Sequence, residues 1–404
     1  MTRKELSSFS SSTSTTRFGL EEFLLICLAI LLPWQSFRFA GLNTGLADIV
    51  VFISSFLILI RGLKLRYVPG LTREVFGLLI AILLSFIYFL LSASDRGSIT
   101  TGLADLVKLF ASVAYFGITI VLLQNNVRHR IHLFASWTVI IGLLISTWTM
   151  FNVFTGDYRV SGPFNNPNLY ADYLLFILFM FFIMINRLSI SNEHRKILLA
   201  IGLMSPVIIS LLGTESRAGL GALFLGFSFY ILMSRDIQKK LNLTQFFVLI
   251  SVSIFPIYYT LRHLFPETIH RFQLVLAGQD TGGRFTRWKS AVEVLTNSPI
   301  FGVGWGQHQE YVGSFYELHN TVLQVSVDAG IVGGLLFVLI LIRGIRSSIQ
   351  WSRKPIYTGS VAMGSFLIAS ISSSIFHNTL NFRTFWIILA MIGSIEIYYY
   401  RNSI

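Results

Sequence analysis

Charged residues are scarce in this sequence. Only 12% of its 404 residues are charged and 53% are hydrophobic, whereas ordinary soluble domains carry roughly 25% charged residues. The mean hydropathy is +0.67. A soluble globular enzyme is therefore excluded, and so is a disordered chain, which combines low hydrophobicity with high net charge.

Cysteine is nearly absent, and the common metal-binding patterns are missing. The single thiol, Cys27, cannot form an internal disulfide or a thiolate metal site. The sequence contains no His-Glu-x-x-His and no Asp-x-Asp pattern, and only Asp48 lies near the first predicted outer loop. We therefore predict chemistry that uses no metal and no cofactor.

Long apolar runs dominate the chain instead. A bilayer span needs about 20 mostly apolar residues, and it must be helical because the backbone finds no other hydrogen-bond partner in lipid. The sequence predicts an all-α polytopic membrane protein with about 12 transmembrane helices. The predicted runs are 22–37, 46–60, 75–91, 103–123, 132–154, 169–186, 198–212, 219–233, 244–261, 320–342, 358–376 and 384–400.

The formal net charge of +12 is unevenly divided between the two sides of the predicted membrane. Both termini and the loops after even-numbered runs hold 20 Lys and Arg residues, and the opposite loops hold 10. The side richer in Lys and Arg is cytoplasmic, so the excess is a topology signal and gives no support for nucleic-acid binding. We predict a cytoplasmic polar tail at 1–19, transmembrane helices 1–9 within 20–261, a large external loop at 262–318 and transmembrane helices 10–12 within 319–404.

The large external loop contains a predicted amphipathic helix at 284–296. Phe285, Trp288, Val292 and Leu295 fall on one stripe of this helix, which predicts that it lies on the membrane surface. A glycine-rich turn segment follows from Pro299. The loop can serve as a lid packed on the bundle or as a substrate cradle, and the two roles are compatible.

Arginine at a membrane boundary is costly unless it is paired or reaches water. Arg217 has two interpretations, a salt bridge with Glu215 and an anion site. A helix N-terminus supplies backbone donors and partial positive charge, and the guanidinium fork suits phosphate oxygens. Arg284 and Arg159 on the same predicted face favour the anion site.

His319 is the other unusual residue of the outer face. An imidazole titrates near neutral pH and can accept a proton, and His319 lies where the external loop re-enters the membrane. The alternative is a helix-capping or interfacial histidine. His377 and Arg383 lie near the outer ends of the last two predicted spans.

Several of these residues occur in patterns that resemble one family. His319-Asn320, followed after nine residues by Gly330-x-x-Gly333, resembles the H-N-x9-G-x-x-G signature of bacterial O-antigen ligases. That superfamily also includes O-antigen polymerases and some protein O-glycosyltransferases. The resemblance extends to Gly283-Arg284-x-x-x-Trp288, to Ser216-Arg217-Ala-Gly and to the stretch 159–168.

The resemblance implies a GT-C-like, metal-independent, inverting glycosyltransferase of the bacterial inner membrane, with both termini cytoplasmic and the external loop in the periplasm. Its donor would be a glycan on undecaprenyl diphosphate and its acceptor a sugar hydroxyl of lipid A–core. By residue matching, Arg217 and Arg284 would bind the diphosphate and His319 would be the catalytic base. The secondary candidates for the site are Arg159, Arg287, Asn320, His377 and Arg383.

Three other functions remain open at this point. An O-antigen polymerase would use the same donor with a lipid-linked glycan as acceptor, and a protein O-glycosyltransferase would use a protein hydroxyl. A transporter is the alternative from another class. Transport sites lie near the bilayer midplane, where the sequence has few ionisable residues, namely Asp105, Lys108 and Asp328.

Overall fold

A computed structural model describes most of the chain. The described residues are 19–34, 38–39, 42–43, 45–61, 70–92, 97–155, 159–185, 193–234, 273–274, 283–313, 318–352 and 359–403. The predicted span at 244–261 and nearly all of the predicted tail at 1–19 lie outside these residues.

The described residues form thirteen α-helices, one 3-10 turn and one very short β-hairpin. The helices are α2 (Leu20–Leu31), α3 (Leu46–Arg61), α4 (Gly70–Leu91), α5 (Ile99–Leu123), α6 (Val127–Phe154), α7 (Pro167–Ile185), α8 (Glu193–Gly213), α9 (Arg217–Met233), α13 (Arg284–Asn297), α14 (His308–Val312), α15 (Thr321–Ser352), α16 (Gly359–Ser374) and α17 (Arg383–Ser403). The other elements are η1 (Gly162–Phe164), β1 (Arg38–Phe39) and β2 (Leu42–Asn43), the two strands pairing antiparallel.

A helix covers each predicted apolar run that falls within the described residues. Five helices, α4, α5, α6, α7 and α15, are long and apolar enough to cross a bilayer, and α3, α8, α9 and α16 are shorter apolar helices. The chain is thus a helical, multi-span membrane protein. The number of twelve crossings stays a prediction.

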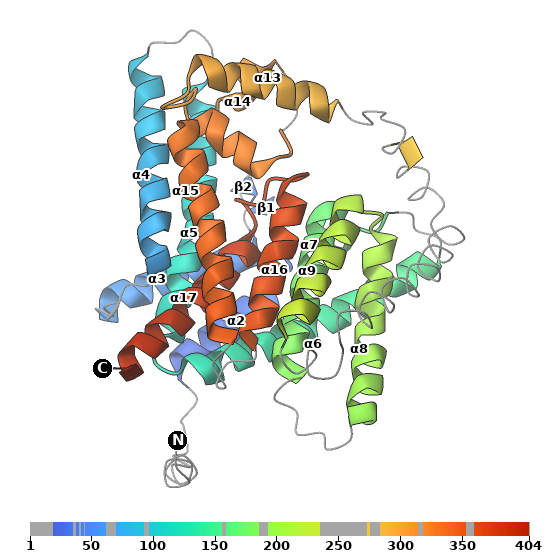
Figure 1. Cartoon of the computed structure of the whole chain (residues 1–404). Coiled ribbons are helices and arrows are strands. Elements are labelled where there is room, and N and C mark those ends of the chain that lie inside the picture. Colours follow the sequence, from blue (N-terminus) through green and yellow to red (C-terminus); the bar gives the residue numbers. More distant parts are fainter. Residues whose placement is uncertain are drawn as a thin grey trace.

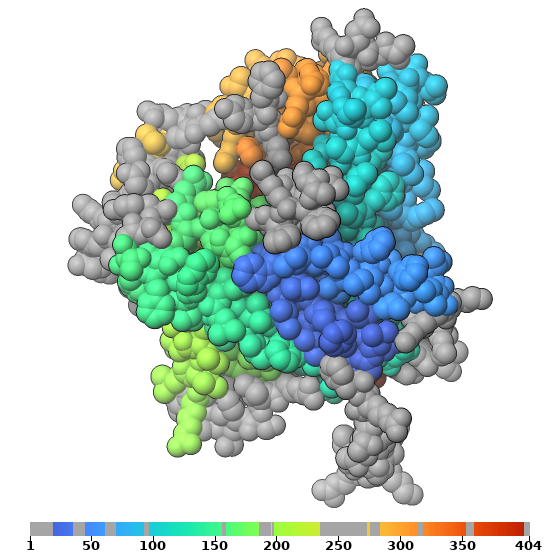
Figure 2. Space-filling model, turned by 180° about the vertical axis from the view of Figure 1, so that it is seen from behind, coloured from blue at the N-terminus to red at the C-terminus, as the bar shows by residue number. Residues whose placement is uncertain are grey.

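The helices pack into a bundle with an apolar interior and an apolar exterior. In Figure 1, α16 lies between α15 and the group formed by α7 and α9, and it packs against all three. Seen from behind, α2 and α3 cover the lower part of the bundle beside α6 (Figure 2). Phe52, Leu59 and Leu91 are 74%, 79% and 79% exposed, as expected of side chains that face lipid.

A small helical unit covers one end of this bundle, and we call it the cap (residues 283–313 and 318–328). It comprises α13, α14 and the first two turns of α15, and Figure 1 shows α13 and α14 at the end of the molecule opposite the C-terminal end of α17. The cap has an apolar core of its own, in which Ala291, Val303, Leu318 and Val327 are buried.

The helix predicted at 284–296 is present as α13, and its buried residue, Ala291, lies outside the predicted apolar stripe. Ala291 is fully buried in the cap core, whereas Phe285 and Val292 of the predicted apolar stripe are 62% and 50% exposed. The small side chain of Ala291 lets α13 approach Val327 of α15 closely. As a result Arg284 and Arg287, which the stripe places away from the buried side, are half-buried.

Candidate active site

The cap is held on the bundle where α15 is broken. Ala329 and Gly330 have non-helical backbone angles, so the break leaves backbone groups without their helical partners. The segment after α13 supplies new ones: the backbone N–H of Val303 donates to the carbonyl of Val327 (2.9 Å) and that of Ile331 to the carbonyl of Pro299 (2.8 Å). Satisfied buried backbone groups are what a stable break requires.

Two glycine-containing motifs of the sequence contact each other where the segment after α13 crosses the break in α15. Gly330 has φ 72° and ψ 178°, a region that only glycine adopts readily. A Cβ on Gly330 would collide with the carbonyl oxygen of Ile300, and one on Gly302 would collide with that of Val327. The glycines after Pro299 and the first glycine of the His-Asn signature are therefore the two sides of one close backbone contact.

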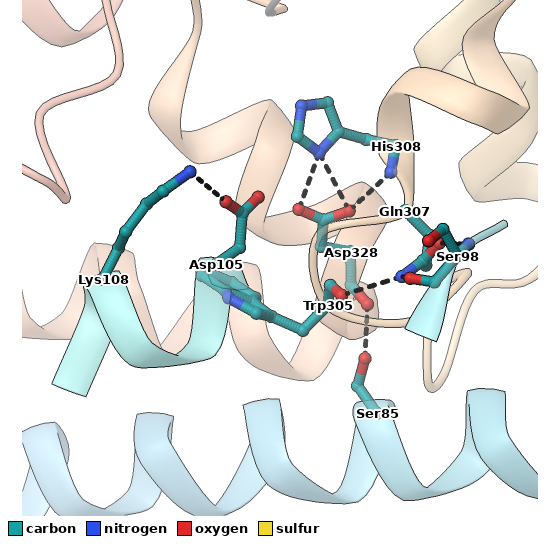
Figure 3. A network of polar contacts seen from close by, with 8 residues as sticks. All are labelled: Ser85, Ser98, Asp105, Lys108, Trp305, Gln307, His308 and Asp328. Atoms are coloured by element: carbon teal, nitrogen blue, oxygen red, sulfur yellow. Dashed lines mark hydrogen bonds and ion pairs between the residues drawn. The ribbon is translucent and has the colours of Figure 1, made fainter. Parts of the chain in front are cut away.

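A buried histidine–aspartate pair fastens the same junction (Figure 3). The imidazole Nδ1 of His308 lies 2.9 Å from Oδ2 of Asp328, and the backbone N–H of His308 donates to Oδ1 of the same carboxylate (2.9 Å). Ser85 of α4 donates to the backbone carbonyl of Asp328, and Gln307 exchanges hydrogen bonds with the backbone of Ser98 at the start of α5. The cap, α4, α5 and α15 are joined in one polar network.

No sequence motif predicts a site role for His308 or Asp328, and no spacing signal connects them. Twenty positions separate the two residues, and Asp328 lies within an apolar run that reads as membrane span. Its charge in that run was the one available signal, since a buried carboxylate needs a partner.

His319 lies at the inner edge of the cap, just before α15. The indole Nε1 of Trp288 donates to the carbonyl of Leu318 (2.9 Å), which ties α13 to the residue before His319. Asn320 caps α15, because its Oδ1 accepts from the backbone N–H of Leu323 (3.0 Å). His319 itself is half-buried, with φ 51°. The structure thus gives Asn320 a capping position beside His319.

His377 lies directly across from His319. The two imidazole rings are 6.2 Å apart between centroids and nearly perpendicular, at 81°. His377 is only 8% exposed, and its Nε2 has no hydrogen-bond partner among the described residues. Arg284 reaches the same place, with Cζ 5.7 Å from the ring centre of Phe376.

Positive charge surrounds both imidazoles. Burial lowers the pKa of His319, and the charges of Arg284 and Arg287 lower it further. Burial, with the charges of Arg284, His319 and Arg159, lowers the pKa of His377 to about 3. Both rings are therefore neutral near pH 7, beside several cations. Five of the residues predicted for the site are thus linked electrostatically in the structure, namely Arg159, Arg284, Arg287, His319 and His377.

Arg159 and Arg217 are placed by one local contact. The backbone N–H of Val160 donates to the carbonyl of Gly213 (3.0 Å), so the exposed Arg159 lies beside the turn that leads into α9. Arg217 is the first residue of α9, whose N-cap is Ser216. The charges that shift the pKa values of His319 and His377 include Arg159, but they do not include Arg217.

Arg383 is engaged in a separate ion pair. Its Nε and Nη2 donate to the two carboxylate oxygens of Asp48, at 2.8 and 2.5 Å, and the hydroxyl of Tyr115 donates to the same carboxylate. This arrangement joins α17, α3 and α5. Within the described residues, the structure shows no group of three or more His, Cys, Asp or Glu placed to hold a metal ion.

The fold and the site together define a multi-span membrane protein with a cationic, imidazole-containing site at one end of its helical bundle. Residues 199–338 match the family model of the O-antigen ligases, Wzy_C, which confirms the resemblance seen in the sequence motifs. The chain is also similar to the teichuronic acid biosynthesis protein TuaE of Bacillus subtilis (strain 168), with 26% identity over 367 residues, covering 79% of this chain and 71% of that protein.

Proposed function

We propose that this protein is an inner-membrane glycosyltransferase that takes a glycan from undecaprenyl diphosphate and attaches it to an acceptor hydroxyl on the periplasmic face. The observation that carries the proposal is the gathering of Arg159, Arg284 and Arg287 around two neutral imidazoles, His319 and His377. The match of residues 199–338 to the O-antigen ligases supports the same chemistry.

The reaction needs a base for the acceptor and a stabilised leaving group. His319 takes the proton of the acceptor hydroxyl, the acceptor oxygen bonds to the anomeric carbon, and the bond from that carbon to the diphosphate oxygen breaks. Undecaprenyl diphosphate leaves with the electron pair, and Arg284 and Arg217 stabilise its charge. Attack from the side opposite the leaving group inverts the anomeric configuration. General-base assistance of this kind contributes about 10²–10⁴ in rate.

The acceptor that we propose first is a sugar hydroxyl of lipid A–core, as in the O-antigen ligases that the motifs resemble. A polymerase is the second candidate, with another lipid-linked glycan as acceptor. One observation favours it, namely the similarity to a protein named for the biosynthesis of another polysaccharide, teichuronic acid. Donor chemistry and the role of His319 are the same for both candidates.

A transfer assay with purified protein tests the proposal. The protein is mixed with an undecaprenyl-diphosphate glycan and lipid A–core in the presence of EDTA, and the products are separated on a gel. We expect the lipid A–core band to shift, and His319→Ala to abolish the shift. His129→Ala, a half-buried histidine in the first turn of α6, is the matched control and should transfer normally.

Each outcome of this assay has a defined meaning. Growth of the donor glycan into longer lipid-linked chains, without a shift of lipid A–core, selects the polymerase. Normal transfer by His319→Ala contradicts the role of His319 as base. If the folded wild-type protein yields neither product from several donors, glycosyl transfer is the wrong function and transport of a lipid-linked sugar takes its place.

A further inference from the structure

His377 is held in a fixed position by its backbone. The hydroxyl of Thr321 donates to the carbonyl of His377 (2.9 Å), and the backbone N–H of Thr379 donates to the same hydroxyl (2.9 Å). The turn between α16 and α17 is thereby attached to the first residue of α15, two positions after His319. The two imidazoles are consequently set against each other by main-chain contacts, before any substrate binds.

The imidazole of His377 has an unused polar atom in a buried place. Its side chain is among the buried polar groups, and within the part of the chain that the structure describes its Nε2 makes no hydrogen bond. An unsatisfied buried donor or acceptor costs about 1–3 kcal/mol, so such an atom in a native protein calls for a reason. A ligand that completes the hydrogen bond is one such reason.

The charges around His377 indicate what kind of ligand this is. Arg284 and Arg159 both act on the imidazole, and they come from different parts of the molecule, Arg284 from the cap and Arg159 from the segment before α7. A group that satisfies Nε2 therefore experiences the positive charge of both guanidinium groups. An anion with several oxygens, such as a phosphate, can accept from all of these donors, and its charge is opposite to that of the two guanidinium groups.

We propose that His377 is a ligand of the donor's diphosphate, with its Nε2–H donating to a phosphate oxygen that also contacts Arg159 and Arg284. This inference rests on the proposed function and goes beyond it, because it divides the work of the two imidazoles. His319 moves the proton of the acceptor, whereas His377 remains neutral throughout and holds the leaving group. A neutral donor suits that task because it stabilises the diphosphate without retaining the product as strongly as a further cation would.

Binding of a short polyprenyl diphosphate tests the inference without any need for turnover. Farnesyl diphosphate is titrated into the purified full-length protein in detergent, and the Kd is measured by calorimetry. A hydrogen bond to a charged group is worth about 1.5–3 kcal/mol, so His377→Phe should raise the Kd at least about tenfold. His377→Gln, whose amide nitrogen reaches the place of Nε2, should restore the Kd to within about threefold of wild type.

One control ligand and one further variant distinguish the loss of this hydrogen bond from a collapse of the site. Farnesol carries the same apolar chain without the phosphates, and its binding should be equal in wild type and His377→Phe. Arg159→Ala removes an exposed side chain, so it tests the arrangement if His377→Phe does not fold. It should also raise the Kd for farnesyl diphosphate about tenfold, since it removes a charged hydrogen-bond donor.

The outcomes distinguish the two proposals. If the wild type binds farnesyl diphosphate and His377→Phe and Arg159→Ala bind it equally well, the inference is overturned and the proposed function stands. A His377→Gln variant as weak as His377→Phe also overturns it, because the ring then acts through packing. If the wild type does not bind farnesyl diphosphate at all, the diphosphate donor and the inference fail together.

Discussion

At the scale of single residues, the two imidazoles of the site differ in what they can do. A general base works best when its pKa lies near the operating pH. His319 is half-buried and its pKa is lowered from an ordinary value near 6.5, so it is neutral and able to take a proton at pH 7. The pKa of His377 is about 3, which is too low for useful proton transfer. Of the two, only His319 has the properties of a base.

After burial and the charge of Arg284, the charge of Arg287 should contribute to the position of the acidic limb of the pH–rate profile. The base must be neutral, so kcat/KM falls as the pH drops through the pKa of His319 in the free enzyme. Arg287 lowers that pKa, and Arg287→Ala should therefore raise it and move the acidic limb to higher pH. The measurement is kcat/KM for glycan transfer between pH 4 and pH 9, an interval set by the usual histidine range.

Two control variants make the shift interpretable. Arg287→Lys keeps the charge and should leave the limb near its wild-type position. Lys289→Ala removes an exposed charge from the same helix, one that is not among the causes of the lowered pKa of His319, and should have little effect. An unchanged limb in Arg287→Ala would show that His319 is not the group being titrated.

At the scale of elements, the break in α15 depends on one glycine. Gly330→Ala places a side chain where only glycine is comfortable, which costs about 1–3 kcal/mol, and its Cβ collides with the carbonyl of Ile300. We expect the cap to be displaced, with a lower Tm in detergent and loss of transfer.

Gly221→Ala in α9 is the control, because its Cβ would meet nothing within 4 Å. Alanine is favoured over glycine in a helix by roughly 0.5–1 kcal/mol, so this variant should not lower the Tm. A Gly330→Ala protein with the Tm and activity of wild type would refute this account of the break.

The buried pair between α14 and α15 should be as important as that glycine. Asp328 is fully buried and accepts from both the ring and the backbone of His308. Removing one partner of a buried pair costs about 3–5 kcal/mol, so Asp328→Ala should lower the Tm strongly. Asp328→Asn retains an oxygen for the backbone N–H of His308 and should lie between Ala and wild type. Tm values measured by tryptophan fluorescence will rank the three proteins, and equal values would mean that the pair does not fasten the cap.

The sequence predicted these elements well where one local signal was sufficient. Apolar runs predicted the described helices of the bundle, and the amphipathic pattern at 284–296 predicted α13 almost to the residue. The apolar stripe of α13 gave no indication that Ala291 is buried, because hydrophobicity alone favours large side chains such as Phe285 over the small Ala291 that the cap core accepts. The pair of His308 and Asp328 could not be foreseen, since it depends on how the glycine-rich segment crosses α15.

At the scale of the whole molecule, the candidate site is divided between two bodies. The cap contributes Arg284, Arg287 and His319, and the bundle contributes Arg159 and His377. In Figure 2 the cap appears in orange above the green helices of the bundle. A bundle without a correctly seated cap lacks the proposed base, so we expect contacts far from His319 to affect the proposed reaction. The secondary candidate Arg383 supports the bundle side through its ion pair with Asp48.

The opposite end of the bundle has polar contacts of a different kind. There Arg343 of α15 pairs with Glu74 of α4 and Glu396 of α17, and Arg130 of α6 lies near Glu21 and Glu22 of α2. These pairs involve residues of the loops and helix ends that the charge distribution places on the cytoplasmic side. Carboxylates thus lie beside Arg343 and Arg130 at this end of the bundle.

The orientation of the molecule in the membrane is the prediction on which the periplasmic site depends. A lipid-linked donor and its acceptor meet only on one side, so the cap must face that side. Single cysteines in a Cys27→Ser background report this directly. Lys289→Cys lies exposed on α13, and Arg346→Cys lies exposed on α15 beyond its break, 25 residues after the first residue of that helix. In right-side-out vesicles, a membrane-impermeant maleimide should label the first and should label the second only after detergent is added. Cys27→Ser alone measures the background.

The reverse labelling pattern would place the cap in the cytoplasm. The 20-to-10 division of Lys and Arg would then oppose the positive-inside rule. The predicted topology would have to be inverted, and with it the side of the membrane on which transfer occurs.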